Sequence, residues 1–304
     1  MPQKTVLITG CSEGGIGAAL AVEFHSRGHR VFATARDTSK MVSLAALGIE
    51  TLALDVVSEI SISEAAATVR EKLLSSSGNT NAGTQTSPQL DILINNAGVN
   101  HVMPFSDTKV PDLRRVIDTN VVGPLAITQA FLPLLIRESG SQSKSTVAML
   151  GSINEVFTPP YQAAYTASKA AVHAAARTLR IELAPLGVQC VTLMTGSVRT
   201  KLFDNAPTKV PEDSLYAAVA DKIEKREFLK NAQWVDADKF AKQVADDLLK
   251  ARPKLDIWRG GLATVASWLA CFGWEGMMVS TLSTLSTYLR PCVLLCDMSP
   301  QRRP

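Results

Sequence analysis

The sequence has no concentration of charge of either sign. Its 304 residues include 31 Lys and Arg against 28 Asp and Glu, which leaves a formal net charge of +3 at pH 7. Because proteins that bind nucleic acids present a basic patch or stripe, this balance argues against a nucleic-acid partner. The hydrophobic fraction of 46% is, by contrast, ample for a large buried core.

Cysteine and histidine are too few and too irregularly spaced for a disulfide framework or a metal site. The five cysteines form no CxxC pair. The four histidines, His25, His29, His101 and His173, show no ligand spacing, so we expect structural or solvated roles for them and no metal. The chain has no Asn-x-Ser/Thr sequon, and its first residues resemble a strand rather than a leader peptide. These absences favour a reducing, cytosol-facing compartment.

Short apolar runs alternate along the chain with longer helical patterns. The runs are Val6–Thr9, Val31–Ala35, Thr51–Leu54, Ile92–Ile94, Val147–Leu150 and Val188–Leu193. The clearest helical segments are Ile16–Arg27, Asp112–Arg137 and Tyr161–Leu186. This alternation predicts an α/β fold with a doubly wound parallel sheet of the Rossmann type. Residues 75–88, rich in Ser, Thr, Asn and Gly, interrupt the rhythm and predict a flexible surface insertion.

A glycine-rich turn joins the first predicted strand to the first helix. Glycines allow the backbone to approach a pyrophosphate, and the N-terminus of the helix then presents free N–H groups to that anion. The expected cofactor contacts in this turn are Gly10, Ser12, Gly15, Ile16 and Gly17. The alternative is a plain strand–helix turn, because four residues, rather than the usual three, separate Gly10 from Gly15.

The end of the second predicted strand indicates which dinucleotide binds. Arg36 lies where a 2′-phosphate would be held, which favours NADPH over NADH. In the alternative, Asp37 contacts the ribose and Arg36 is only solvated. Asp37 can also cap the helix that begins near Ser39. Glu13 places an acid near the expected phosphates and weakens the prediction of NADPH.

Tyr165 and Lys169 are four residues apart on the last long helical segment, so their side chains share one helix face. A lysine ammonium beside a tyrosine favours the phenolate and is expected to lower the pKa of the phenol. Such a pair can pass a proton to a developing alkoxide, as carbonyl reduction requires. A surface pair without function is the alternative interpretation.

Taken together, the motifs resemble the short-chain dehydrogenase/reductase family over roughly residues 4–260. They are Thr9-Gly10…Gly15-Ile16-Gly17, Asp55, Asn95-Asn96-Ala97-Gly98, Asn120, Gly151-Ser152, Tyr165-x-x-x-Lys169 and Gly196-x-Val198-x-Thr200. One departure is Thr195-Gly196, where the family has Pro-Gly.

The resemblance implies a role for each of these residues. It makes Tyr165 the general acid/base, with Lys169 lowering its pKa and binding the nicotinamide ribose. It implies that Ser152 forms a hydrogen bond with the substrate carbonyl and that Asn120 holds a water that relays protons to Lys169. Contacts to the cofactor are expected from Asp55 (adenine), Asn96 (cofactor path), Val198 and Thr200 (carboxamide).

A narrower resemblance is to the fungal group of NADPH-dependent 1-acyldihydroxyacetone-phosphate reductases, carried by Thr-Gly-Cys-Ser-x-Gly-Gly-Ile-Gly and Phe-Ala-Thr-Ala-Arg. It implies hydride transfer between NADPH and the carbonyl or hydroxyl of an apolar or lipid-like substrate, in either direction. The alternatives are a ketone reductase of secondary metabolism, a non-catalytic cofactor-binding protein on the same fold, and a membrane-tethered interaction protein. The family also implies a homodimer that pairs the segments Asp112–Arg137 and Tyr161–Leu186.

The last part of the chain differs from the rest in composition. We expect a catalytic domain over residues 1–259 and a hydrophobic helical appendage over residues 260–304. Between Gly260 and Leu289 the only charge is Glu275, and Trp258, Trp268 and Trp274 lie at the start of this stretch. The pattern predicts peripheral association with a membrane surface, namely the cytoplasmic face of the endoplasmic reticulum or a lipid droplet. A lid over the active site or a dimer contact is the alternative.

Overall fold

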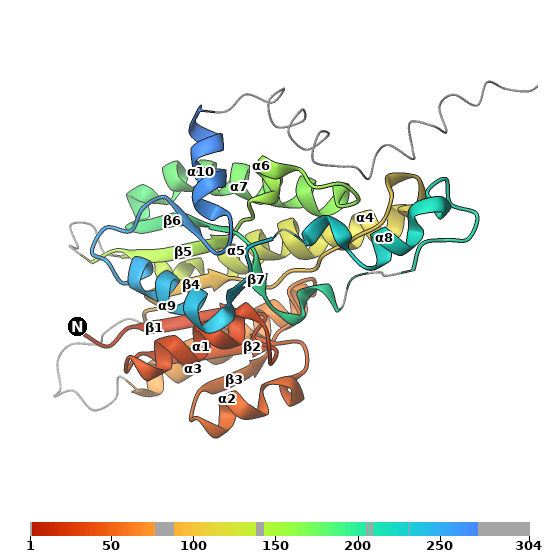
Figure 1. Ribbon diagram of the computed structural model, residues 1–304. Coiled ribbons are helices and arrows are strands. Elements are labelled where there is room, and N and C mark those ends of the chain that lie inside the picture. The colour runs from red at the N-terminus through yellow and green to blue at the C-terminus, as the bar shows by residue number, and fades with distance from the viewer. Residues whose placement is uncertain are drawn as a thin grey trace, which may run out of the picture.

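A parallel β-sheet forms the centre of the molecule (Figure 1). The structure is a computed structural model that describes residues 2–76, 88–137, 143–204, 206, 209–230 and 232–272. Within these residues the main sheet has the strand order β3-β2-β1-β4-β5-β6-β9, and every pairing is parallel. Its strands are β1 (Thr5–Thr9), β2 (Arg30–Ala35), β3 (Glu50–Ala53), β4 (Ile92–Asn95), β5 (Ser145–Leu150), β6 (Val188–Thr195) and β9 (Asp256–Arg259).

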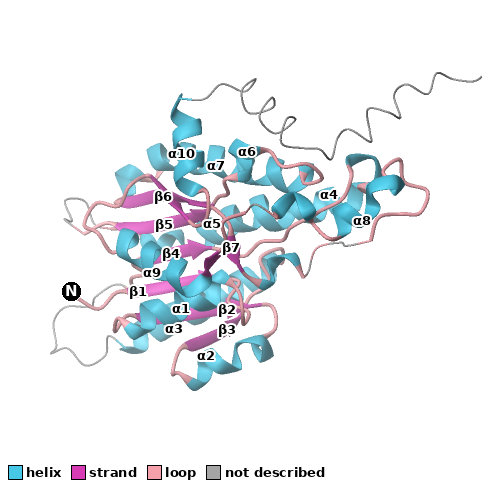
Figure 2. Cartoon of the chain, viewed as in Figure 1, coloured by secondary structure: helices cyan, strands magenta, loops and turns pink. Residues whose placement is uncertain are grey.

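Helices cover both faces of this sheet, as Figure 2 shows. They are α1 (Ile16–Ser26), α2 (Val42–Ala46), α3 (Glu59–Ser76), α4 (Val110–Ile117), α5 (Gly123–Leu135), α6 (Asn154–Phe157), α7 (Ala163–Glu182), α8 (Ala220–Glu224), α9 (Ala237–Leu248) and α10 (Ala263–Phe272). The two short strands β7 (Val198–Arg199) and β8 (Val235–Asp236) pair with each other, apart from the sheet. The doubly wound fold predicted from the sequence is thus confirmed.

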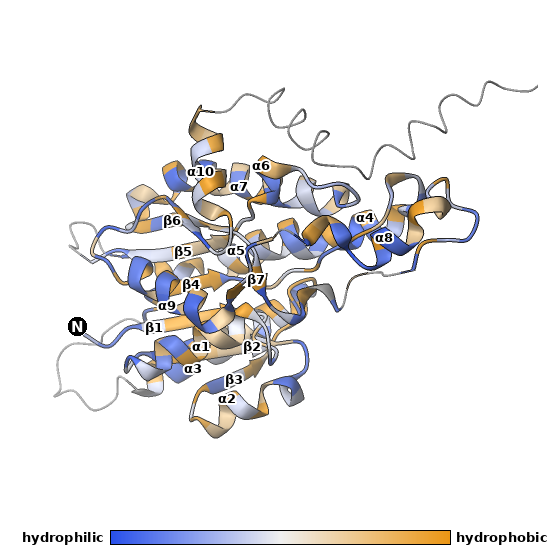
Figure 3. Cartoon of the chain, viewed as in Figure 1, coloured by the Kyte–Doolittle hydropathy of each residue, from blue (hydrophilic) through white to orange (hydrophobic). Residues whose placement is uncertain are grey.

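The core forms two layers because strand side chains alternate between the faces. Val6 and Ile8 of β1 pack in the layer that contains α1 and α9, whereas Leu7 packs in the layer of α3, α5 and α7. The strands therefore carry apolar side chains on both faces, which is visible as hydrophobic colour along β1 and β4 in Figure 3. This burial explains why the central strands are continuous apolar runs in the sequence.

Two elements differ in detail from the sequence expectations. The segment predicted as helical, Asp112–Arg137, is helical from Val110 to Leu135, but a π turn, Asp118–Val122, interrupts it and divides it into α4 and α5. Pro124 lacks the N–H that a regular helix requires, so the helical hydrogen-bond pattern changes just before it. The sequence patterns also did not predict strand β9, because its four residues, Asp-Ile-Trp-Arg, hold only two apolar residues between two charged ones.

The C-terminal appendage is helical where it is described. Helix α10 packs Ala263 and Ala266 against Ile153 and Val156 beside α6. Among the residues that the structure describes, no helix combines the length and apolar content needed to cross a membrane. The pattern predicted around Leu282–Leu289 lies outside the described residues, as does most of the insertion predicted at 75–88. The domain boundary at residue 259 stays a prediction.

Candidate active site

The site begins at the crevice where the strand order reverses, between β1 and β4. Asn96, directly after β4, donates from Nδ2 to the carbonyls of Thr9 (2.7 Å) and Gly10 (3.0 Å) at the end of β1. Thr9 Oγ1 in turn accepts the N–H groups of Asn96 and Ala97, each at 3.0 Å. In open α/β sheets, ligands bind outside the carboxyl ends of the strands at such a reversal.

The glycine-rich turn passes too close to its neighbours for side chains. A Cβ on Gly17 would lie 2.4 Å from the Gly10 carbonyl oxygen, and one on Gly10, whose φ is +74°, would lie 2.8 Å from Ala97 Cα. Helix α1 starts at Ile16 without a side-chain cap and without an acid in its first turn. Its first N–H groups therefore remain available to an anion, so the turn fits a pyrophosphate.

The extra residue of this turn is accommodated at Gly14. Its φ is +78°, in the left-handed region, and the Gly15 N–H donates to the Ser12 carbonyl at 3.1 Å. The Lys201 side chain lies against Gly14, and its N–H donates to the Gly14 carbonyl at 3.3 Å. Lys201 thus brings a cation to the phosphate turn that the sequence motifs did not indicate, and, in addition to hydrogen bonding with Ser43, its charge helps to lower the pKa of the neighbouring Glu13 carboxyl. Glu13 accepts the Ser43 N–H through Oε1, at the beginning of α2.

At the end of β2, Arg36 is exposed, and no ion pair to it is found among the described residues. Asp37 accepts the Ser39 N–H (2.9 Å) and caps the 3₁₀ turn Thr38–Met41. The capping role expected for Asp37 is confirmed, which leaves Arg36 as the side chain free to meet a 2′-phosphate. Asp55 lies just beyond β3 and accepts the Val57 N–H.

Asn120 occupies the π turn between α4 and α5 and is 1% exposed. Its Oδ1 accepts the Val99 N–H at 2.8 Å, and its Nδ2 donates to the Val99 carbonyl and to Ser168 Oγ, both at 2.9 Å. The side-chain amide is thus fully occupied. Since Pro124 cannot donate, the Asn120 carbonyl lacks its usual α-helical partner.

The predicted catalytic side chains converge at the end of β5. Tyr165 and Lys169 lie on α7, buried to 9% and 3% exposure. Ser152 follows β5, accepts the Asn154 N–H at 3.1 Å and forms a hydrogen bond with Tyr165. Lys169 Nζ donates to the Leu150 carbonyl at 2.7 Å and lies 5.6 Å from the centre of the Tyr165 ring.

Burial dominates the protonation of this pair. It raises the pKa of Tyr165 to about 12, against the opposing effect of the hydrogen bond with Ser152. It lowers the pKa of Lys169 to about 8, because an ammonium without a counter-ion is poorly solvated there. The expected lowering of the tyrosine pKa by Lys169 is therefore wrong for this structure. The phenol is protonated at neutral pH and can serve as a proton donor.

The remaining predicted residues lie on the segment after β6. Val198 is buried in β7, and Thr200 accepts the Leu202 N–H. Thr195, which replaces the family's proline, extends β6 by pairing with Arg259. A Cβ on Gly196 would lie 2.1 Å from the Gly261 carbonyl oxygen, so the connection from β9 to α10 crosses directly against this loop.

Sequence reasoning missed several contributors besides Lys201. Thr9 organises the end of β4, and a Cβ on Gly98 would lie 3.2 Å from Asn120 Oδ1 and 3.7 Å from Lys169 Nζ. His173, expected to be structural or solvated, joins a charged network one helical turn beyond Lys169. The Asn95-Asn96-Ala97-Gly98 motif could have indicated the role of Gly98, whereas no local sequence pattern identified His173.

Comparisons with known proteins agree with this geometry. The short chain dehydrogenase family matches residues 4–211. A short-chain dehydrogenase/reductase of Pestalotiopsis microspora is 39% identical, covering 93% of this chain and 94% of that protein. The NADPH-dependent 1-acyldihydroxyacetone phosphate reductase of Schizosaccharomyces pombe is 41% identical over 70% of this chain and 68% of that protein. The crystal structure of a Streptomyces avermitilis short-chain dehydrogenase superposes with a TM-score of 0.71, 27% identity and 99% coverage of both chains. The chain belongs to the short-chain dehydrogenase/reductase family of oxidoreductases.

Proposed function

We propose that this protein is an NADPH-dependent reductase of an apolar or lipid-like ketone. The observation that carries the proposal is the buried group of Ser152, Tyr165 and Lys169 near the carboxyl ends of β1, β4 and β5. Two hydroxyls that share a hydrogen bond there can both approach one carbonyl oxygen. The same residues serve alcohol oxidation, so the reaction direction follows from the ratio of the cofactors.

The chain's own residues account for the proton in this reaction. Ser152 accepts a backbone N–H, which leaves its hydroxyl hydrogen to polarise the substrate carbonyl. Tyr165 is protonated at neutral pH and can give its proton to the developing alkoxide. Lys169, with its pKa near 8, and the Asn120 carbonyl can return a proton through water to the phenol. Bound NADPH supplies the hydride.

The proposed choice of NADPH rests on two cations. Arg36 stands exposed at the end of β2, no acid in the described part of the chain forms an ion pair with it, and the Lys201 side chain lies against the phosphate turn. Asp37 is already engaged with the Ser39 N–H, so it is not arranged to bind a ribose diol. The Schizosaccharomyces pombe relative is named as NADPH-dependent, which supports the same cofactor.

An apolar substrate is supported by a cluster beyond the carboxyl ends of the strands, near α8. Its buried members are Val102, Ala206, Val210, Val219 and Ile223, and Tyr161, Tyr216 and Phe228 pack against it. Tyr161 lies one turn before Tyr165, and its carbonyl accepts the Met103 N–H. The partly exposed rings of Tyr161, Tyr216 and Phe228 could contact an acyl chain, whereas a secondary-metabolite ketone is the alternative substrate.

The direct test is NADPH consumption against a panel of ketones that includes 1-acyldihydroxyacetone phosphate and aromatic ketones of similar size. Turnover that rises with acyl chain length would support a lipid substrate. Turnover confined to aromatic ketones would support the secondary-metabolite alternative. Tight NADPH binding without turnover of any ketone would overturn the proposal in favour of a cofactor-binding protein.

We also propose that the protein works at the cytoplasmic face of the endoplasmic reticulum or on lipid droplets. On α10, Val265, Trp268 and Phe272 are 50%, 66% and 75% exposed, and the two aromatic rings lie 5.3 Å apart. The opposite face of α10 is buried against α6. An uncharged helix with exposed aromatic residues is suited to lying at a lipid interface.

A homodimer through α5 and α7 is the proposed assembly. The small residues Ala163, Ala167, Ala170, Ala171 and Ala174 of α7 are exposed and Ala175 is partly buried, which supports a face that a second copy could approach closely. Ile181, on the same helix, is 78% exposed. A monomeric mass in light scattering at micromolar concentration would contradict the dimer.

A further inference from the structure

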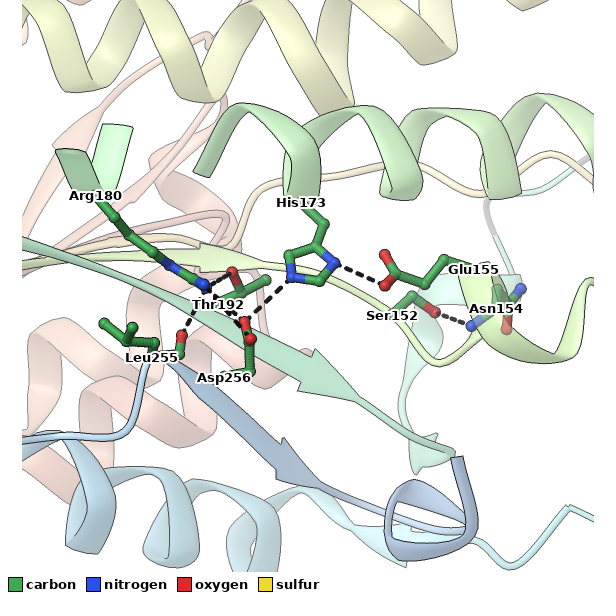
Figure 4. Close-up of polar contacts among 8 residues, drawn as sticks. All are labelled: Ser152, Asn154, Glu155, His173, Arg180, Thr192, Leu255 and Asp256. Carbon is green, nitrogen blue, oxygen red and sulfur yellow. Dashed lines mark hydrogen bonds and ion pairs between the residues drawn. The ribbon is translucent and has the colours of Figure 1, made fainter. Parts of the chain in front are cut away.

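A charged network lies one turn of α7 beyond Lys169 (Figure 4). His173 Nδ1 lies 2.7 Å from Glu155 Oε1, and its Nε2 lies 3.2 Å from Asp256 Oδ1. Arg180, two turns further along α7, donates to the same Asp256 carboxylate, to the Leu255 carbonyl and to Thr192 Oγ1. The side chains of Glu155, His173 and Arg180 are each at most 16% exposed.

The geometry determines the charge of this imidazole. Both partners of His173 are carboxylates, which accept hydrogen bonds and do not donate them when ionised. A neutral imidazole has one N–H and could satisfy only one of them. The imidazolium has two N–H groups and satisfies both, so the two carboxylates hold a doubly protonated ring between α6 and β9.

One of these two contacts reaches the active site. Glu155 is the second residue of α6, and the first, Asn154, donates its N–H to Ser152 Oγ. The position of α6 therefore sets the direction of the Ser152 hydroxyl. Helix α6 contacts α7 through the charged pair and α10 through Val156, which packs with Ala263 and Ala266. Asn154 Nδ2 also donates to Gln162 Oε1 (3.2 Å), just before α7, so breaking the charged pair would remove one of the side-chain links that hold α6 against the helix that carries Tyr165.

We propose that His173 is a positioning residue, which in its protonated form holds Glu155 and thereby keeps the Ser152 hydroxyl aligned with the Tyr165 hydroxyl. This inference rests on the proposed function, because alignment matters only if both hydroxyls meet the same substrate oxygen. Displacements of about 1 Å in a catalytic group can cost a hundredfold in rate. His173 touches no reacting atom and acts only through α6.

The surroundings of His173 favour its charged form from each element that carries an ionisable group. Glu155 faces it from α6 and Asp256 from β9, whereas the cation Arg180 on α7 is directed at Asp256. Helix α10 has no charged residue. These carboxylates raise the pKa of His173 to about 9. Its contribution to stability is therefore complete below about pH 6.5 and is lost as the pH rises through about 9.

The first test does not depend on catalysis. Carbon-13 labelling of the four histidine rings, with His173→Gln to assign its signal, allows an NMR titration of His173. We expect a pKa near 9 in the wild type and a clear fall in Glu155→Gln. A pKa at or below about 6.5 in the wild type would overturn the inference even if the enzyme is active.

The second test measures kcat per NADPH-binding site, with the number of sites counted by fluorescence titration. Glu155→Gln and His173→Gln should each lower this kcat between about ten- and a hundredfold, with the NADPH dissociation constant unchanged within twofold. The double variant should be no worse than either single one, because both changes remove the same contact.

A matched control is Glu50→Gln, which removes a carboxylate that also accepts an ion pair at 2.7 Å, from Arg30. That pair joins β2 and β3, so Glu50→Gln should leave kcat per site within twofold. If Glu155→Gln lowers only the number of sites, His173 is merely structural and the inference fails. If the wild type consumes no NADPH with any ketone, the proposed function fails, while the NMR titration still decides the charge of His173.

Discussion

The two sides of the candidate active site are built by different means. On the cofactor side, glycines bring backbone against backbone, and the N–H groups of α1 and the side chain of Arg36 remain available to a ligand. On the catalytic side, Asn120, Ser152 and Lys169 are already engaged in hydrogen bonds within the protein. The binding half is therefore shaped by missing side chains, and the reacting half by side chains that are held in place.

This difference suits the two tasks. A pyrophosphate carries its own charge and needs only close approach and free donors. A proton transfer needs heavy atoms within hydrogen-bond distance and in a fixed direction. Substitutions on the cofactor side should consequently weaken NADPH binding, whereas substitutions on the catalytic side should lower turnover.

The largest effect is expected for Tyr165→Phe, because it removes the proton donor and leaves the cofactor side intact. Turnover should fall by about 10²–10⁴-fold, with NADPH affinity within a few-fold of the wild type. Steady-state kinetics and fluorescence titration measure the two quantities separately. More than about a tenth of wild-type kcat would remove Tyr165 from the role of acid.

Gly17→Ala should produce the opposite pattern. The new Cβ would lie 2.4 Å from the Gly10 carbonyl oxygen and 2.6 Å from Asn96 Nδ2, so the turn must shift. We expect at least about a tenfold loss of NADPH affinity and a fall of about 1–3 kcal/mol in the free energy of unfolding. Urea denaturation checks the second value, and unchanged affinity would show that the turn does not contact the cofactor.

Arg36→Ala should weaken NADPH roughly tenfold or more and leave NADH unchanged, because a charge-assisted contact to phosphate contributes about 1.5–3 kcal/mol. The ratio of kcat/KM for the two cofactors measures this. Arg70→Ala is a suitable control, since Arg70 is exposed on α3. Equal preference for both cofactors in the wild type would contradict the proposed role of Arg36.

The smallest effect, a few-fold, is expected for a change outside the candidate active site. Trp268→Ser with Phe272→Ser removes the exposed aromatic pair of α10 without touching its buried face. Flotation with phosphatidylcholine vesicles should recover less of this variant, while turnover of a soluble ketone stays unchanged. If turnover falls and flotation does not, α10 acts as a lid rather than as a membrane contact.

Much of this architecture was predictable because a sheet buried on both faces requires apolar residues along its strands. Six of the seven main strands are apolar runs, and the glycines of the phosphate turn stand where backbone approach requires them. Tyr165 and Lys169 are separated by one helical turn, so a local pattern revealed them. The resemblance to a known family supplied Asn120 and Ser152, which no spacing rule would have identified.

The features that escaped prediction depend on residues far apart in the chain. His173 and Asp256 are 83 positions apart, and Arg180 reaches Asp256 only after β9 pairs with β6. The pKa of Tyr165 could not be predicted either, since burial, which raises it, is set by packing. The capping role of Asp37, by contrast, could be predicted, because its side chain accepts the N–H of a residue only two positions further along the chain.

The position of β9 has a consequence for how the enzyme is made. Asp256, which completes the hydrogen bonds of His173, opens the last strand of the sheet. At about 5–20 residues per second, a ribosome adds Asp256 roughly 4–17 seconds after His173. During that interval α7 lacks its carboxylate partner on β9, although the glycine-rich turn, Arg36 and Asn96 have already been synthesised. The nascent chain is thus expected to contain the first part of its nucleotide site well before His173 can be held between its two carboxylates.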